Sequence, residues 1–97
     1  MSFAEAKAKN IKSIFDECMK KIMDNYNNGR SETELFIEKE YASEVKGMIS
    51  EAVEKVSPHF SWMTVRTATN PYTGRYENFS GEVIGNQMRY KLKYFGE

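Results

Sequence analysis

A two-residue turn near the C-terminus is the feature that most constrains how this chain can fold. Ile84-Gly85-Asn86-Gln87 has glycine and asparagine at its centre, and residues of alternating polarity flank it on both sides. This pattern is typical of a β-hairpin. Glycine at the first central position readily adopts the positive φ of a type II′ turn. The spacing therefore predicts an antiparallel hairpin with Gly85 and Asn86 at its tip.

The turn also predicts the register of the hairpin, and with it two faces of different character. The apolar face would hold three cross-strand pairs: Val83 opposite Met88, Gly81 opposite Tyr90, and Phe79 opposite Leu92. The polar face would hold three more: Glu82 opposite Arg89, Ser80 opposite Lys91, and Asn78 opposite Lys93. Pairs of this kind stabilise a sheet by about 0.2–1 kcal/mol each. We expect the apolar face of this hairpin to pack on the core and the polar face, with its cations, to be exposed.

Two segments have apolar residues at steps of three and four, which predicts two amphipathic helices. The first covers about residues 3–27. Ser2 and Glu5 have the spacing of a capping box at its start, and Asn27-Asn28-Gly29 favours a stop. The second covers about residues 41–56 and ends at Ser57-Pro58, because helical geometry is disfavoured for the residue before proline.

Two further segments are predicted to be strands. Residues 32–38 alternate between apolar and charged side chains, as on an edge strand. Ser31 and Glu34 also have capping-box spacing, so a helical start stays open there. Phe60 to Ala68 is predicted to be one continuous strand.

Proline and glycine in the segment 70–74 favour a β-turn after that strand. The predicted order is then α-β-α-β-β-β. We expect an α+β fold in which two helices pack on one face of a small, mostly antiparallel sheet. A length of 97 residues suits a single domain over 1–97.

Composition argues against several classes of protein. Fourteen basic and fourteen acidic residues give no net charge, whereas a dedicated nucleic-acid binder usually has a basic excess. Cys18 is the only cysteine, so no internal disulfide can form. No apolar run approaches the ~20 residues that span a bilayer, and the N-terminus has no apolar signal core. We expect a cytoplasmic protein with no membrane partner.

Catalytic and metal-binding patterns are weak in this sequence. His59 is the only histidine, and Cys18 lies on the apolar stripe of the first helix, as a structural cysteine would. Four carboxylates in the second quarter of the chain are typical of a charged edge strand, with a divalent-cation site as the alternative. They are Glu32, Glu34, Glu38 and Glu40. We expect no catalytic site, no metal and no cofactor.

Two groups of residues suit binding. The segment 70–76 contains Tyr72, Arg75 and Tyr76, which are residue types enriched at interface hot spots. A row of cations is predicted on the polar face of the hairpin: Arg89, Lys91 and Lys93. We expect these six residues to bind a protein partner.

Nucleic-acid binding is the alternative. Rings interleaved with cations on a sheet can stack single-stranded bases. If Trp62 lay on the outer face, such a surface would combine five residues: Trp62, Arg66, Arg89, Lys91 and Lys93. Zero net charge favours the other interpretation, with Trp62 in the core.

The stretch from Thr33 to Ile49, which follows a lysine-rich helix, resembles small bacteriophage and prophage accessory proteins. The resemblance covers about residues 3–56 and lies in the style of composition. It implies a protein that binds a host or viral protein and occludes it without catalysis. A defence enzyme or a nucleic-acid-processing enzyme is the kind of target that it implies. Self-association stays open, because a charged edge strand is only a moderate barrier to it.

Overall fold

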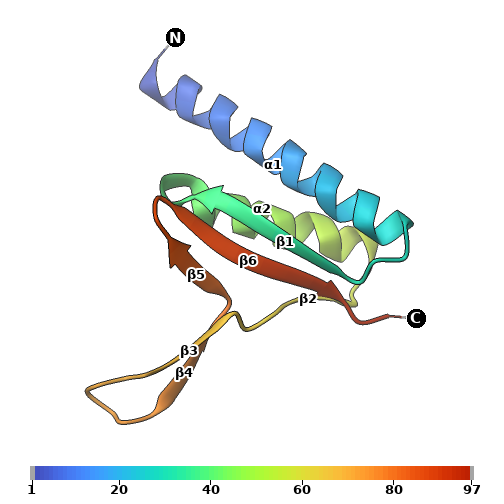
Figure 1. The fold of residues 1–97 in the computed structure, drawn as a ribbon. Coiled ribbons are helices and arrows are strands. Elements are labelled where there is room, and N and C mark those ends of the chain that lie inside the picture. Colours follow the sequence, from blue (N-terminus) through green and yellow to red (C-terminus); the bar gives the residue numbers. More distant parts are fainter. Residues whose placement is uncertain (1, 97) are drawn as a thin grey trace.

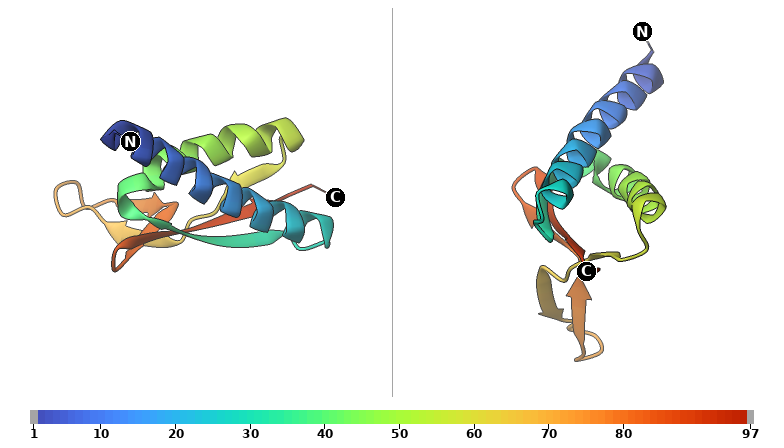
Figure 2. Two further views of the ribbon diagram at one scale, coloured as in Figure 1. Left: turned by 90° about the horizontal axis from the view of Figure 1, so that it is seen from above. Right: turned by 90° about the vertical axis from the view of Figure 1, so that its right-hand side faces the viewer.

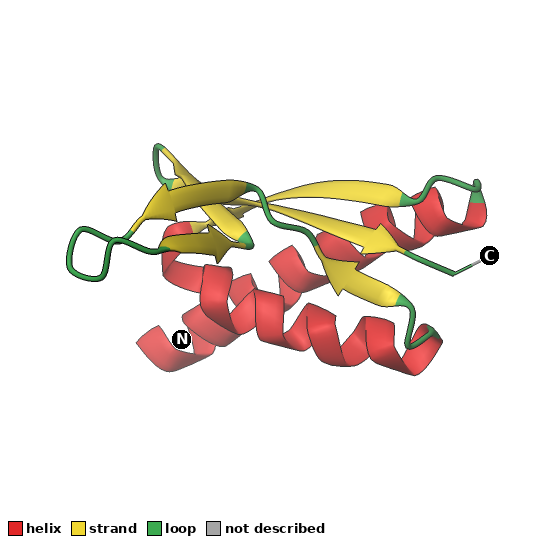
Figure 3. Ribbon diagram, turned by 90° about the horizontal axis from the view of Figure 1, so that it is seen from below, coloured by secondary structure: helices red, strands yellow, loops and turns green. Residues whose placement is uncertain are grey.

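The computed structural model describes residues 2–96 and shows two layers (Figure 1 and Figure 3). One layer contains the helices α1 (Phe3–Asn27) and α2 (Lys39–Val56). The other layer is the main sheet, formed by β1 (Glu32–Glu38), β2 (Phe60–Trp62), β5 (Gly81–Ile84) and β6 (Gln87–Tyr94). Two more strands, β3 (Arg66–Thr69) and β4 (Tyr76–Phe79), form a separate ribbon. Both helices lie on one face of the main antiparallel sheet, which confirms the predicted α+β class.

The main sheet is organised around β6, which pairs on both of its edges. β1 runs antiparallel along one edge, from Glu32 opposite Lys93 to Glu38 opposite Gln87. Residues 32–38 therefore form the predicted strand and not a helical start. β5 pairs with the first half of β6 on the other edge, and β2 pairs with the second half.

The hairpin turn at Gly85-Asn86 is confirmed. Gly85 has a φ of 61°, and no non-glycine residue among those described has a positive φ, as a type II′ turn requires. The predicted register holds from the turn back to Gly81, which lies opposite Tyr90. The two faces of this part of the hairpin are therefore as predicted.

Beyond Gly81 the predicted pairing is wrong. Phe79, Ser80 and Asn78 do not lie opposite Leu92, Lys91 and Lys93, because β2 occupies that edge of β6. Trp62 pairs there with Leu92 and Ser61 pairs with Lys93. The rings of Phe60 and Trp62 in β2 lie beside those of Tyr94 and Tyr90 in β6. The chain before Gly81 turns away from the sheet.

The single predicted strand from Phe60 to Ala68 is also wrong, because it breaks between Trp62 and Arg66 into β2 and β3. β3 pairs only with β4, in the register Arg66 opposite Phe79 through Thr69 opposite Tyr76. This two-stranded ribbon, residues 66–79, forms an arm. It extends from the sheet on the side opposite the helices (Figure 1; Figure 2, right).

The core fills the space between the helices and the inner face of the sheet. The largest side chains that are less than 2% exposed come from both helices, β1 and β6, and are Ile22, Leu35, Ile37, Val45, Ile49 and Leu92. At the start of α1, the Glu5 N–H donates to Ser2 Oγ at 3.2 Å, which is the hydroxyl half of the predicted capping box. At the start of α2, the Lys39 N–H donates to the carbonyl oxygen of Asn86 at 2.9 Å, which joins this helix to the hairpin turn.

Candidate partner-binding surface

The arm exposes most of its surface. All four residues of β4 and three of the four residues of β3 are exposed, and Tyr72 and Tyr76 are 95% and 79% exposed. An isolated two-stranded hairpin is at best marginally stable in water, since it buries little apolar area. Large aromatic rings that stay exposed on their own domain are typical of an interaction surface.

The tip of the arm is nevertheless held by hydrogen bonds centred on Asn70. The Asn70 N–H donates to the Arg75 carbonyl at 2.8 Å, and the Gly74 N–H donates to the Asn70 carbonyl at 2.8 Å. The Asn70 side chain accepts from the Tyr72 N–H and donates to Glu77, both at 2.8 Å. Gly74 has a φ of 68°, which favours glycine. The tyrosines therefore project from a preformed loop, which lowers the ordering cost of binding.

The arm also has an unbalanced charge. Within residues 2–96, neither Arg66 nor Arg75 lies within ion-pair distance of a carboxylate. The one carboxylate of the arm, Glu77, accepts a hydrogen bond from Asn70. Arg75 lies between Tyr72 and Tyr76 in the chain, and Arg66 lies at the base of the arm, opposite Phe79. Two guanidinium groups without a carboxylate partner suit a partner surface that carries carboxylates.

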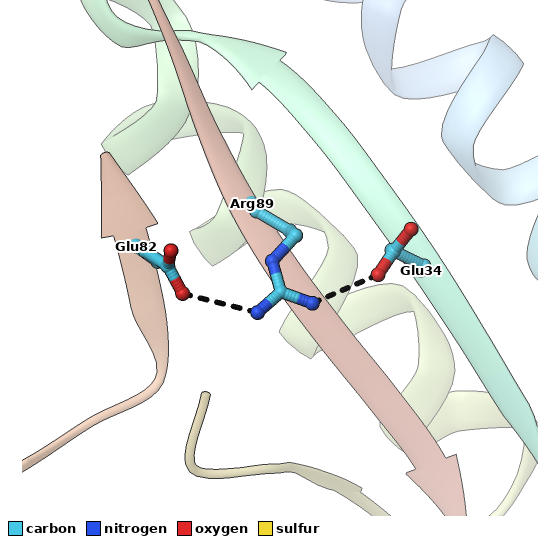
Figure 4. Close-up of polar contacts among 3 residues, drawn as sticks. All are labelled: Glu34, Glu82 and Arg89. Carbon is cyan, nitrogen blue, oxygen red and sulfur yellow. Dashed lines mark hydrogen bonds and ion pairs between the residues drawn. The ribbon is translucent and has the colours of Figure 1, made fainter. Parts of the chain in front are cut away.

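The outer face of the sheet differs from the predicted row of free cations. Arg89 lies between two carboxylates from the flanking strands, with Nη1 at 2.9 Å from Glu34 and Nη2 at 3.0 Å from Glu82 (Figure 4). These hydrogen bonds, first that to Glu82 and then that to Glu34, raise the pKa of Arg89. With its side chain only 21% exposed, Arg89 joins β1, β6 and β5 and has little capacity left for a partner.

Lys91 and Lys93 follow Arg89 on the same face of β6. In the register with β1, Lys91 lies opposite Glu34 and Lys93 lies opposite Glu32. The Lys93 ammonium also lies 5.1 Å from the centre of the Phe95 ring, within the range of a cation–π interaction. Carboxylates thus alternate with the predicted basic row, and the outer face is of mixed charge.

Replacement of Arg89 by leucine is expected to lower the urea midpoint of unfolding, because it leaves Glu34 and Glu82 without their shared cation. Arg75→Leu, an identical change on the exposed arm, is the control and should change the midpoint little. The difference should shrink in about 1 M NaCl, since salt screens ion pairs. Equal midpoints for the two variants would contradict a structural role for Arg89.

Trp62 does not lie beside the basic row. It faces the helices, where its Nε1–H donates to Ser50 Oγ at 2.8 Å and its ring meets Tyr90 edge-on at 5.6 Å between ring centres. Arg66 lies on the arm, while Arg89 lies on the outer face of the sheet. The five residues of the nucleic-acid alternative are therefore divided among three places and do not form one stacking surface.

Lys46 is the residue that sequence reasoning missed. The helical pattern groups it with the charged residues that lie mostly off the apolar stripe of α2. In the structure its ammonium lies 5.2 Å from the ring centres of both Trp62 and Tyr90 and donates to Ser80 Oγ. Burial lowers the pKa of Lys46. The only hint in the sequence is Ser50, one helical turn further along the same flank.

The residues considered for catalysis lie in ordinary structural settings. Cys18 is part of the core, and burial raises the pKa of its thiol, which disfavours the reactive thiolate. The His59 ring packs edge-on against Tyr94, with 6.2 Å between the ring centres. Among residues 2–96, no three His, Cys, Asp or Glu side chains gather as a metal site would require. No helix within that same range is long and apolar enough to cross a bilayer.

Comparison with protein-family models, with curated proteins and with solved structures found no match for this chain.

Proposed function

We propose that this chain is a small, non-catalytic binding protein that recognises another protein through the arm. The observation that carries the proposal is the tip of the arm, which hydrogen bonds centred on Asn70 hold in place. Tyr72 in this loop is 95% exposed, and Tyr76, the first residue of β4, is 79% exposed. Tyrosine and arginine offer large contact area and polar groups at low entropic cost.

The partner surface that fits best carries carboxylates around an apolar pocket. Arg66 and Arg75 supply the unpaired charge on the arm. Lys91 and Lys93 add two cations on the outer face of the sheet, where Glu34 and Glu32 lie opposite them. Arg89 is the weakest of the predicted contacts because Glu34 and Glu82 already satisfy it. The arm supplies the anchors of the interface, and the outer face supplies its polar rim.

The resemblance to bacteriophage accessory proteins gives this proposal its context. The partner would be a host or viral protein in the cytoplasm of the host cell. Binding of the arm would occlude or modulate a defence enzyme or a nucleic-acid-processing enzyme. An arm that extends away from the body of the domain suits such a role, since it can enter a cleft that the body could not enter.

The proposal predicts a position-specific photo-crosslink. With p-benzoyl-phenylalanine in place of Tyr72, irradiation in bacterial cells should yield one discrete adduct with a second protein. The matched control places the same photo-reactive residue at Phe3, which is 85% exposed and lies in the first turn of α1. Addition of Arg75→Ala and Tyr76→Ala to the Tyr72 probe should reduce the adduct about ten-fold or more, as loss of hot-spot residues does.

Two results would contradict the proposal. One is equal labelling from Tyr72 and Phe3, and the other is an adduct that consists of two copies of this chain. Titration with labelled oligonucleotides at two salt concentrations tests the nucleic-acid alternative. Micromolar binding with a steep salt dependence would favour that alternative over a protein partner.

A further inference from the structure

The arm joins the body of the domain at two points that lie beside one lysine. Trp62 is the last residue of β2 before the chain leaves for the arm, and Ser80 is the single residue between β4 and β5. Lys46, on α2, contacts both: its ammonium lies over the Trp62 ring and donates a hydrogen bond to Ser80 Oγ.

The surroundings of the Lys46 ammonium fix its position. It lies 5.2 Å from the ring centres of both Trp62 and Tyr90, within the ~6 Å range of cation–π attraction. Ser50 holds the indole from the same helix, because its hydroxyl accepts from Trp62 Nε1 at 2.8 Å and donates to the Lys46 carbonyl at 2.9 Å. The chain that departs for the arm is therefore held to α2 by two contacts of Trp62, one with Lys46 and one with Ser50. The chain that returns from the arm is held to α2 by the hydrogen bond from Lys46 to Ser80.

The sheet also holds the base of the arm, since Trp62 pairs with Leu92 and Gly81, next to Ser80, pairs with Tyr90. The Met63 N–H donates to the Lys91 carbonyl at 2.8 Å, and the Val65 N–H donates to the Phe79 carbonyl at 2.9 Å. The first bond joins the departing chain to β6, and the second joins the two chain segments to each other at the base of the arm. Lys46 joins both chain segments at the base of the arm to a helix.

We propose that Lys46 is a latch that sets the direction of the arm, by holding its departing and returning chain segments with one ammonium group. The latch rests on the proposed function for its purpose, since an arm with a preset direction binds a partner with less loss of freedom. Lys46 acts as a positioning residue: it orients the arm and does not contact the partner.

The single tryptophan makes the latch directly measurable, because Trp62 reports on the departing chain while Ser80 lies on the returning chain. Ser80→Ala removes the hydroxyl that accepts from Lys46 and leaves a part-buried ammonium without that acceptor. We expect the ammonium to shift toward water, acrylamide quenching of Trp62 to rise about two-fold, and the Met63 and Val65 amides to exchange several-fold faster.

The matched control is Thr67→Ala, which removes another hydroxyl hydrogen bond within the arm, to Asn78 at 3.1 Å, away from Lys46. It should leave Trp62 quenching unchanged. A second variant, Lys46→Met, keeps a long side chain without charge and should act in the same direction as Ser80→Ala. Its control is Lys55→Met on the exposed side of the same helix. If Lys46→Met fails to fold, Ser80→Ala and Thr67→Ala still decide the test.

Wild-type quenching and wild-type amide exchange in Ser80→Ala would overturn the latch. A purely local hydrogen bond predicts that result, because Ser80 would then have no influence on Trp62. The crosslink from Tyr72 separates the two proposals. Its absence in the otherwise wild-type chain counts against partner binding alone, whereas the latch is judged by fluorescence and exchange. If Ser80→Ala raised Trp62 quenching but left the yield of the crosslink from position 72 unchanged, a positioning role for Lys46 would likewise be refuted.

Discussion

Ile49→Ala is expected to lower the free energy of unfolding by about 3 kcal/mol, within the range typical of buried isoleucine truncations. Ile49 is 0% exposed and lies in the core between α2 and the inner face of the sheet. Removal of three carbon atoms there loses the transfer free energy and also leaves a cavity that close-packed neighbours fill only in part. Because a small domain is stable by only about 5–15 kcal/mol, the loss is large.

Urea denaturation followed by circular dichroism measures this effect, with the slope of the transition as a check that the unfolded state has not changed. Val56→Ala is the control, since Val56 lies at the end of the same helix and is 43% exposed. It should cost less than about 1 kcal/mol. A loss at Val56 as large as that at Ile49 would show that α2 does not face the sheet as described.

Two glycine-to-alanine changes are expected to have opposite effects on stability. An ideal Cβ at Gly81 would lie 2.6 Å from Tyr90 Cε1 and 3.0 Å from Met88 Cε. The Tyr90 ring is buried beside Trp62 and Lys46, so it has little room to move. Gly81→Ala should therefore destabilise the domain by about 1–3 kcal/mol, as overpacking does.

Gly47 is the matched control on α2, where an added Cβ meets nothing within 4 Å. Gly47→Ala should stabilise the domain by about 0.5–1 kcal/mol, because alanine loses less backbone entropy than glycine in a helix. Thermal unfolding of the two variants gives both signs in one experiment. If both changes raised the melting temperature, the close approach of β5 to the Tyr90 ring would be disproved.

Local patterns in the sequence predicted the regular parts of the fold correctly. The bounds of α1, the strand at 32–38 and the Gly85-Asn86 turn each depend on residues close together in the chain. The error lay in the partner of residues 78–80, where two strands compete for one edge of β6. Phe60 and Trp62 occupy that edge, and no local signal shows that they do. The break after Trp62 has no proline or glycine to mark it.

The candidate site was predictable to a similar degree. Tyr72, Arg75 and Tyr76 lie in or directly after the predicted turn at residues 70–74, and no core pattern includes them, so their exposure was predictable. The neutralisation of Arg89 by Glu34 was not predictable, since it needs the register of β1 against β6 across 55 residues. The role of Lys46 needs three elements at once, whereas helical periodicity places it only at the flank of the apolar stripe.

The central position of β6 has a consequence for biosynthesis. β1, β2 and β5 each hydrogen-bond to β6 and not to one another. Until residues 87–94 have been synthesised and have left the ribosome, these three strands have no neighbour with which to pair. The helices can form early from local contacts, but the sheet must assemble in one late step. A nascent chain that pauses before Gln87 would expose three unpaired strands to chaperones and to aggregation.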